Sequence, residues 1–244
     1  MIRRIAYTII LAVLFFSCKN QNSNDLTALV DPFIGTDATG NTYPGATVPF
    51  GMVQLSPDTY NDGCCSGYHY RDSAILGFSH THLSGTGVAD FGDILVMPGT
   101  EPGKGLRIAS RGPGLRRDDN ASEGYESKFK HSSEKASPGY YSVFLEDFKI
   151  KAELTATKRV GLHRYTFPKS DQSRILFDLE HGIMNGDKPL EDCYLRVVNP
   201  TEIEGLRHSQ GWAPDQYVYF VARFSEPFAD PVASPASLNR RQAL

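Results

Sequence analysis

The chain of 244 residues lacks both a strong excess of one charge sign and a long apolar segment. Its formal net charge is −3, and its 25 Lys and Arg residues form no basic cluster. Nucleic-acid-binding surfaces depend on such clusters, so the composition predicts no nucleic-acid partner. The apolar run at residues 5–16 has 12 residues, whereas a membrane-spanning helix needs about 20. This run therefore does not predict a transmembrane helix.

The N-terminal segment instead has the features of an export signal. Two arginines precede the apolar run, and the small residue Ser17 stands directly before Cys18. This order is typical of a secretory signal and resembles that of a bacterial lipoprotein. We therefore expect residues 1–18 to be a signal peptide with Cys18 lipidated, and residues 19–28 to be a flexible tether. A plain signal peptide with an incidental cysteine is the alternative. The lipoprotein would attach to a membrane through its lipid anchor, in the periplasm, outer membrane or cell surface.

Cysteines are few, and their number leaves their chemistry open. Cys64, Cys65 and Cys193 remain when Cys18 is set aside. Because three is an odd number, at least one of them stays outside any bridge within the chain. A bridge from Cys64 or Cys65 to Cys193 and three buried thiols are both compatible with the spacing. No second closely spaced pair completes a tetrahedral set, so a zinc site is poorly supported.

Helical periodicity is missing after the N-terminal segment, and strand patterns take its place. Residues 139–167 and 215–228 alternate between apolar and polar side chains over most of their length. Short strands separated by Gly and Pro turns predict an antiparallel β-sandwich. We expect residues 29–230 to form one all-β domain without internal repeats, and residues 231–244 to be an irregular tail.

The motif GFSHTHLSGTGVADFGD at residues 77–93 is a dense cluster of polar side chains. If the segment is a strand, His80 and His82 lie on the same face, where a further ligand would complete a metal-dependent hydrolase. Histidines hydrogen-bonded on a surface facing a partner are the alternative that the spacing favours. The segment lacks the third glycine of a dinucleotide fingerprint and the pattern of a nucleophile elbow. The candidates for a third metal ligand are His69, Asp90 and Asp93.

Paired carboxylates are typical of glycoside hydrolysis, and Asp90 with Asp93 or Asp62 with Asp72 are possible pairs. No spacing rule singles out a catalytic pair among 28 acids, so ordinary turn residues are favoured. The residues themselves support an exported β-sandwich with a polar, Gly-rich and aromatic-flanked surface between residues 31 and 93. Such a surface suits sugar rings, which have apolar faces and hydroxylated edges.

Three long motifs resemble the N-terminal domain of glycoside hydrolase family 92, a family of exo-acting α-mannosidases. They are VDPFIGTDATGNTYPGATVPFGMVQLSPDT at residues 30–59, CSGYHYRDSAILGFSHTHLSGTGVADFGDILVMP at 65–98 and SQGWAPDQYVYFVARFS at 209–225. The resemblance implies an N-terminal β-sandwich, supersandwich-like, packed on a C-terminal (α/α)6 barrel that this sequence does not contain. It implies an inverting, calcium-dependent reaction on mannose-containing glycans, including the processing of N-glycans.

The resemblance also places the catalytic acid, the base and most calcium ligands in the barrel. We therefore assign no catalytic or metal-binding residue here, and we expect the chain to be inactive without the barrel, which is missing or a separate chain. Family members often carry Trp before the DGC motif, whereas this chain has Asn61, which puts an α-1,2 preference in doubt. Two alternatives are a free-standing carbohydrate-binding lipoprotein and the His/Asp metal-dependent hydrolase.

In the family the N-terminal domain helps to form the wall of the substrate pocket, through three loops that match motifs of this chain. His80 and His82 are expected to support this wall and the face toward the barrel. The residues that the resemblance assigns to the pocket wall are Tyr43, Pro44, Gly45, Asp62, Gly63, Cys64, His80, His82 and Asp90.

Overall fold

The computed structural model describes residues 26–59, 65–100, 124–183 and 190–229. The chain divides into two compact units, Met1–Val30 and Asp31–Leu244. In the first unit, the described residues include one short 3₁₀ helix, η1 (Leu26–Leu29). The predicted signal peptide with Cys18, most of the tether and the predicted tail lie outside the described residues. Over the part of the chain that the structure describes, no helix is long and apolar enough to cross a membrane.

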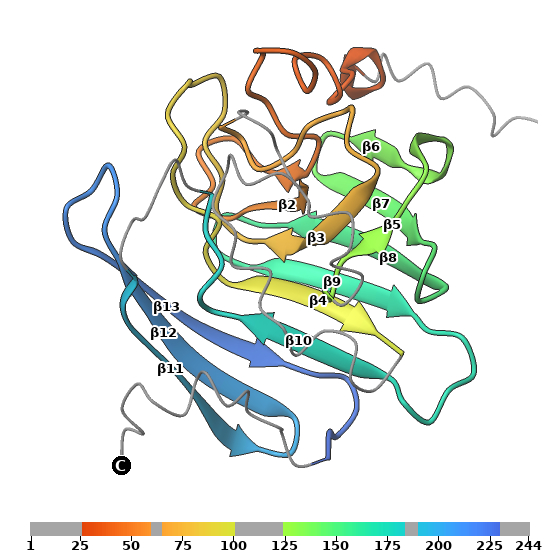
Figure 1. Cartoon of the computed structure of the whole chain (residues 1–244), viewed down its shortest axis with the longest axis vertical. Coiled ribbons are helices and arrows are strands. Elements are labelled where there is room, and N and C mark those ends of the chain that lie inside the picture. Colours follow the sequence, from red (N-terminus) through yellow and green to blue (C-terminus); the bar gives the residue numbers. More distant parts are fainter. Residues whose placement is uncertain (1–25, 60–64, 101–123, 184–189, 230–244) are drawn as a thin grey trace, which may run out of the picture. The chain divides into compact units, whose positions relative to one another are not determined.

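The second unit consists of antiparallel strands and one 3₁₀ turn, η2 (His131–Ser133), as Figure 1 shows. This arrangement confirms the predicted all-β antiparallel fold. The largest sheet has six strands. Five of them are hydrogen-bonded in the order β1-β2-β3-β4-β10, and β5 pairs with β3 outside this order. The strands are β1 (Ala46–Thr47), β2 (Gln54–Thr59), β3 (Ala74–Ser79), β4 (Leu95–Gly99), β10 (Arg174–Asp178) and β5 (Ser127–Lys128).

Two further sheets complete the unit. The four-stranded sheet contains the alternating segment that the sequence predicts, and the three-stranded sheet ends with the predicted C-terminal strand. The strands of the first are β6 (Lys135–Ser137), β7 (Tyr140–Leu145), β8 (Ile150–Ala156) and β9 (Gly161–Thr166). Those of the second are β11 (Leu190–Asn199), β12 (Glu202–Ser209) and β13 (Gln216–Arg223).

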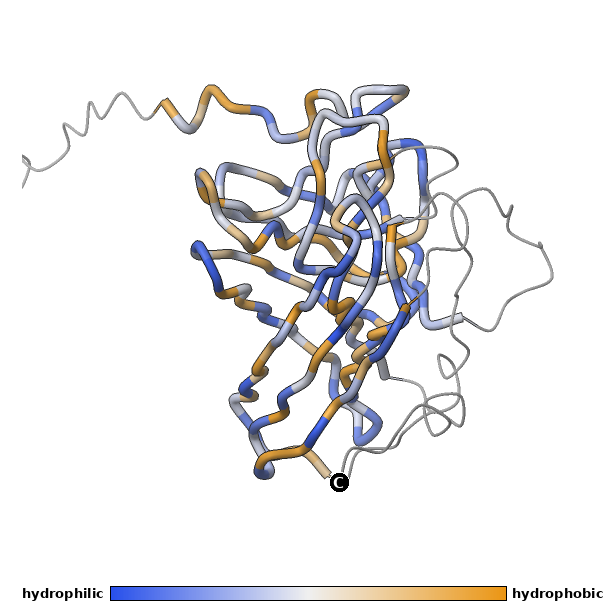
Figure 2. The backbone as a smooth tube through the Cα atoms, turned by 90° about the vertical axis from the view of Figure 1, so that its left-hand side faces the viewer, coloured by the Kyte–Doolittle hydropathy of each residue, from blue (hydrophilic) through white to orange (hydrophobic). Residues whose placement is uncertain are grey.

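The core lies between the six-stranded and four-stranded sheets. Leu55, Phe78 and Leu95 from the first pack in one apolar cluster with Tyr141 and Leu154 from the second, and all five are almost completely buried. Burying an aliphatic or aromatic side chain stabilises a fold by about 1.5–3 kcal/mol. Apolar and polar residues alternate along many of the strands in Figure 2, as a sandwich with one buried face per sheet requires.

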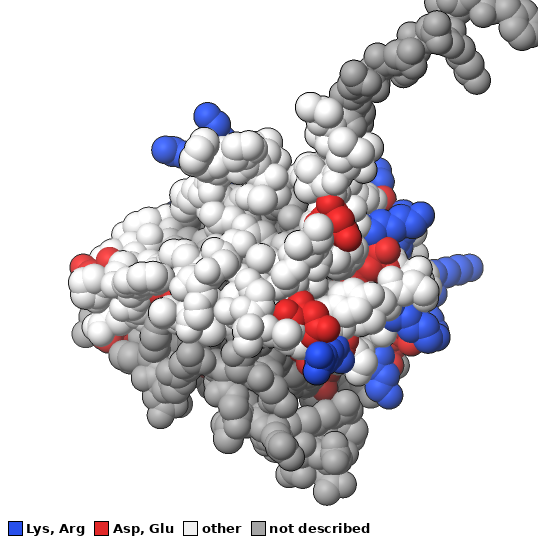
Figure 3. Space-filling model, turned by 90° about the horizontal axis from the view of Figure 1, so that it is seen from above, with Lys and Arg blue, Asp and Glu red and all other residues white. Residues whose placement is uncertain are grey.

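The strands β3 and β4 are buried along their whole length, which explains why their sequences do not alternate. The three-stranded sheet lies beside β10 in Figure 1, and the rings of Phe177 and Phe220 stack there with centroids 6.1 Å apart. In the face shown in Figure 3, acidic and basic side chains are interspersed rather than separated by sign.

Candidate functional site

The segment before β1 brings Tyr43, Pro44 and Gly45 against β2. Pro44 and Gly45 are buried, and a Cβ on Gly45 would lie 2.3 Å from the carbonyl oxygen of Leu55. Only glycine permits so close an approach of two backbones. The Tyr43 ring in turn lies near the ring of His82, with centroids 5.0 Å apart. The structure therefore brings two of the predicted pocket-wall loops together.

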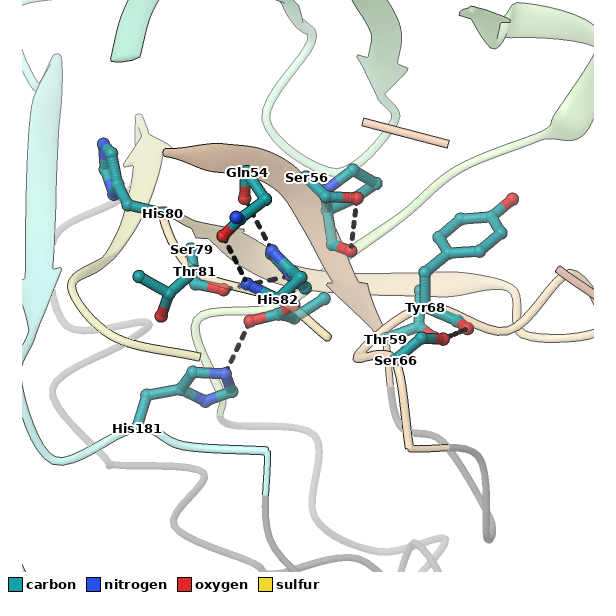
Figure 4. A network of polar contacts seen from close by, with 12 residues as sticks. Gln54, Ser56, Thr59, Ser66, Tyr68, Ser79, His80, Thr81, His82 and His181 are labelled. Atoms are coloured by element: carbon teal, nitrogen blue, oxygen red, sulfur yellow. Dashed lines mark hydrogen bonds and ion pairs between the residues drawn. The ribbon is translucent and has the colours of Figure 1, made fainter. Parts of the chain in front are cut away.

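His82 is fully buried, and both of its ring nitrogens face acceptors. Nδ1 lies 2.7 Å from the backbone oxygen of Gln54, and Nε2 lies 2.6 Å from Oδ1 of Asp58 in β2. A carbonyl and a carboxylate can only accept, so both nitrogens donate and the ring carries two protons. In Figure 4 the His82 ring lies among Gln54, Thr81 and His181. His82 and Asp58 therefore form a buried ion pair.

A second histidine holds the other oxygen of Asp58. His181, which follows β10, donates from Nε2 to Oδ2 over 2.7 Å. Burial would raise the pKa of Asp58, but the charge of His82 and the hydrogen bonds from His181 and His82 hold it well below its usual range. One carboxylate thus joins β2 to the segments after β3 and β10. Gly67 passes over it so closely that a Cβ would lie 2.5 Å from Oδ1.

Asp93 is a second buried carboxylate, and it connects the His-Thr-His segment at residues 80–82 to β12. Arg207 donates from Nη1 to Oδ1 over 2.6 Å, and both side chains are almost wholly inaccessible. Thr81 and Gln216 donate to Oδ2 over 2.6 and 3.0 Å. Because both of its oxygens accept hydrogen bonds within the domain, Asp93 is a structural anchor.

Asp90 connects the glycine-rich loop to the hairpin between β12 and β13. Its carboxylate accepts hydrogen bonds from the backbone nitrogens of Phe91 and Trp212, at 2.8 and 2.6 Å. A Cβ on Gly211 would lie 2.2 Å from Oδ1, so this contact also needs glycine. Trp212 remains 64% exposed. Asp90 therefore holds the hairpin that presents Trp212 at the surface, and its assignment to the pocket wall stays a prediction.

His80 does not join this network. Its Nδ1 lies 2.7 Å from the backbone oxygen of Ile94, its Nε2 lies 3.0 Å from Nε2 of His163, and in Figure 4 it points away from His82. The prediction that His80 and His82 share one face is wrong, because β3 ends at Ser79 and the alternation of a strand stops there.

Metal ligation by the described residues has little support beyond pairs of side chains. Over residues 26–59, 65–100, 124–183 and 190–229, no group of three or more His, Cys, Asp or Glu side chains is placed to hold an ion. Calcium requires six to eight oxygen ligands, whereas Asp58, Asp90 and Asp93 are already engaged. The described residues do not fit a calcium site.

Some predicted residues lie outside the described part of the chain. Asp62, Gly63 and Cys64 are among them, so their assignment to the pocket wall stays a prediction. Cys65 is buried and Cys193 is half-buried, and the pairing alternatives that involve Cys64 stay open.

Four residues in the hydrogen-bond networks of Asp58, Asp90 and Asp93 were not predicted from the sequence. Asp58 and Trp212 lie inside quoted motifs, whereas His181 and Arg207 come from segments that carry no recognisable spacing signal. Only the fold brings His181 to Asp58, across 123 residues of sequence. The single tryptophan of the sequence, which directly follows Gly211, was one available signal.

The chain matches known proteins over nearly all of its described residues. The profile of the "Glycosyl hydrolase family 92 N-terminal domain" matches residues 29–236. The solved structure of the family GH92 alpha-mannosidase BT3965 from Bacteroides thetaiotaomicron is 42% identical, with a TM-score of 0.75, and the match covers 84% of this chain and 26% of that one. A second structure of that enzyme contains mannoimidazole.

Two more distant relatives agree with this match. The inverting mannosidase BT2199 from Bacteroides thetaiotaomicron is 27% identical, with a TM-score of 0.62 and coverage of 85% and 26%. An uncharacterized secreted glycosidase from Arthroderma benhamiae is 28% identical over 197 residues, which are 77% of this chain and 24% of the relative. The chain thus spans about a quarter of the length of these proteins. It belongs to glycosyl hydrolase family 92, and residues 29–236 correspond to the N-terminal domain of that family.

Proposed function

We propose that this domain forms one wall of the sugar pocket of an exo-α-mannosidase that acts on mannose-containing glycans. The observation that carries the proposal is the Asp58–His82 ion pair, around which the segment of Tyr43, the loop after β3 and the segment after β10 meet. Segments distant in sequence converge there at a built polar site. The mannosidases that match most of this chain support a mannoside as the ligand.

The domain's part in the reaction is to position the sugar. An inverting glycosidase needs a protonated acid and a base about 6.5–9.5 Å apart, with room for water between them. Asp58, Asp90 and Asp93 accept hydrogen bonds from histidines, backbone amides and Arg207, and these contacts give them a structural part in the domain. We propose that the acid and the base belong to an (α/α)6 catalytic domain outside this sequence.

The calcium dependence and the inverting course belong to the same proposal. The described carboxylates do not fit the ion, so its ligands would also lie in the catalytic domain, and no step of the reaction is assigned to it here. Burial raises the pKa of Tyr43, which keeps its phenol protonated at neutral pH. A protonated phenol beside His82 is a suitable hydrogen-bonding partner for a sugar hydroxyl.

Export as a lipoprotein is the proposed location. The short apolar run before Cys18 supports it, as does the relative described as a secreted glycosidase. Metabolic labelling with a palmitate analogue tests the anchor. The analogue should label the wild-type protein and leave Cys18→Ser unlabelled, and equal labelling of both would contradict it.

A domain exchange tests the pocket-wall function. Residues 29–236 replace the aligned domain of the Bacteroides thetaiotaomicron enzyme that is 42% identical. The chimera should release mannose from an α-mannoside, whereas this chain alone should release none. His82→Ala in the chimera should lower kcat/KM by about 10–100-fold, as loss of a positioning contact does. Mannose release by the chain alone, or a folded chimera without activity, would refute the proposal.

Free-standing carbohydrate binding is the second candidate function, and one observation favours it. Trp212, Tyr217 and Tyr219 expose half or more of their surface on the hairpin of β12 and β13. Aromatic rings in such positions bind the apolar faces of sugars. Retention of the isolated chain on a mannan column, lost in Trp212→Ala, would support this function.

A further inference from the structure

His80 and His163 meet between two sheets, away from the Asp58 network. His80 follows β3 of the six-stranded sheet, and His163 lies in β9 of the four-stranded sheet. Their Nε2 atoms are 3.0 Å apart, with ring centroids 5.0 Å apart. Both residues are half-buried. Gly161 leaves room for the imidazole, since a Cβ there would lie 2.9 Å from Cδ2 of His80.

The hydrogen bonds define where the protons of this pair lie. Nδ1 of His80 donates to the carbonyl of Ile94, so in the neutral ring Nε2 carries only a lone pair. His163 therefore donates from Nε2 to His80, and its Nδ1 accepts from the hydroxyl of Tyr165 at 2.7 Å. Burial lowers the pKa of both histidines, which keeps the two rings neutral at neutral pH.

We propose that His80 and His163 form a two-histidine site for a divalent late transition metal, Cu²⁺ above others. The ion would take the place of the single proton between the two Nε2 atoms. That proton moves to Nδ1 of His163, where it is donated to the oxygen of Tyr165, so no net proton is released. The remaining coordination positions would be filled by water or a small ligand. This site is separate from the hydrogen bonds around Asp58 and goes beyond the proposed pocket-wall function.

The spacing of the two nitrogens favours copper or nickel over zinc. With metal–nitrogen bonds of about 2.05 Å, the 3.0 Å separation corresponds to an N–metal–N angle of about 94°. Neighbouring positions of a square-planar Cu²⁺ or Ni²⁺ site lie close to this angle, whereas tetrahedral Zn²⁺ needs a wider one. Copper also binds imidazole most tightly in the first-row series.

Each imidazole lies beside a group that can serve as the outer partner of a metal-bound histidine. Ligating histidines almost always donate their second nitrogen to a carbonyl, carboxylate or similar acceptor, which fixes the ring. The carbonyl of Ile94 does this for His80, and the hydroxyl of Tyr165 would do so for His163.

Titration of the purified full chain with CuSO₄ tests the site, with calorimetry and electron paramagnetic resonance as readouts. We expect one tightly bound Cu²⁺ per chain with hyperfine coupling to two imidazole nitrogens. His163→Gln should weaken this binding by at least about 100-fold, and Tyr165→Phe by about tenfold with both nitrogens retained. His69→Gln changes a half-buried histidine outside the pair and should leave the affinity unchanged.

Circular dichroism is used to check that each variant is folded. If His163→Gln does not fold, the copper affinity of Tyr165→Phe still tests the site. Equal copper affinity in the wild type, His163→Gln and Tyr165→Phe would overturn the proposal, as would a spectrum without two coupled nitrogens. Mannose release by the chimera does not depend on copper binding, so failure of one proposal is distinguishable from failure of the other.

Discussion

At the scale of single residues, Asp58 stays charged although it is buried, because two histidines donate to its carboxylate. Removing one partner of a buried ion pair leaves a charge without compensation, which costs about 3–5 kcal/mol. His82→Ala should therefore lower the free energy of unfolding by about that amount in urea denaturation. His208→Gln is the control, because His208 pairs with the largely exposed Asp215. It should change stability by about 1 kcal/mol or less, and an equally small effect of His82→Ala would contradict the buried ion pair.

The same carboxylate makes stability depend on pH in a defined direction. The pKa of Asp58 is depressed in the folded chain, since the histidines outweigh the effect of burial. The unfolded chain therefore binds the proton first as the pH falls, so the stabilisation is complete above about pH 5 and is lost at lower pH. Urea unfolding at pH 6 and pH 3 should show a smaller acid-induced loss in Asp58→Asn than in the wild type. Asp171→Asn, at an exposed position, is the control, and identical losses in all three proteins would contradict the assignment.

At the scale of elements, the segment before β1 can lie close to β2 because Gly45 has no side chain. A Cβ on Gly45 would collide with the backbone of Leu55 and Ser56, which cannot move aside without breaking the sheet. Gly45→Ala should destabilise the fold by about 1–3 kcal/mol, the usual cost of overpacking. Gly87→Ala is a matched control, because nothing lies within 4 Å of its Cβ position. Denaturation midpoints measure both, and equal midpoints would refute the close contact.

The strands show how far the sequence can predict this fold. The alternating segments that became β7, β8 and β13 are recognisable, because one face of each is more buried than the other. The fully buried β3 and β4 carry no alternation, and only their turn residues mark them. His80 and His82 do not share one face because β3 ends at Ser79, and the alternation of side chains along a strand does not continue past its end.

The candidate site was only partly predictable, for a related reason. Tyr43, His82 and Asp90 lie within motifs that resemble a known family, so they could be assigned by position. The partners of these residues come from elsewhere: His181 follows β10 and Arg207 lies in β12. No local spacing encodes such contacts, because they arise from the packing of three sheets.

At the scale of the whole molecule, one exposed side chain points to a partner surface. Phe50 is completely exposed and has φ +57°, a conformation that is strained for a bulky residue. Phe50 takes the third position of a β-turn behind Pro49, which the backbone nitrogen of Gly51 closes by donating to the carbonyl of Val48 over 2.9 Å. Glycine or asparagine is usual at this position, whereas here a large apolar ring is presented to solvent, and the first solved relative is about three times as long as this chain. We therefore expect Phe50 to pack against the catalytic domain proposed above.

This expectation predicts opposite effects in two contexts. Phe50→Gly should stabilise the isolated chain by up to about 1 kcal/mol, because glycine adopts positive φ without strain. The same change in the chimera should lower its melting temperature, since it removes an apolar anchor between the domains. Ala38→Gly is the matched control, because Ala38 is exposed with φ +52° but has no large side chain to lose. It should leave the chimera unaffected, and a chimera equally stable with and without the Phe50 ring would show that this side chain does not join the two domains.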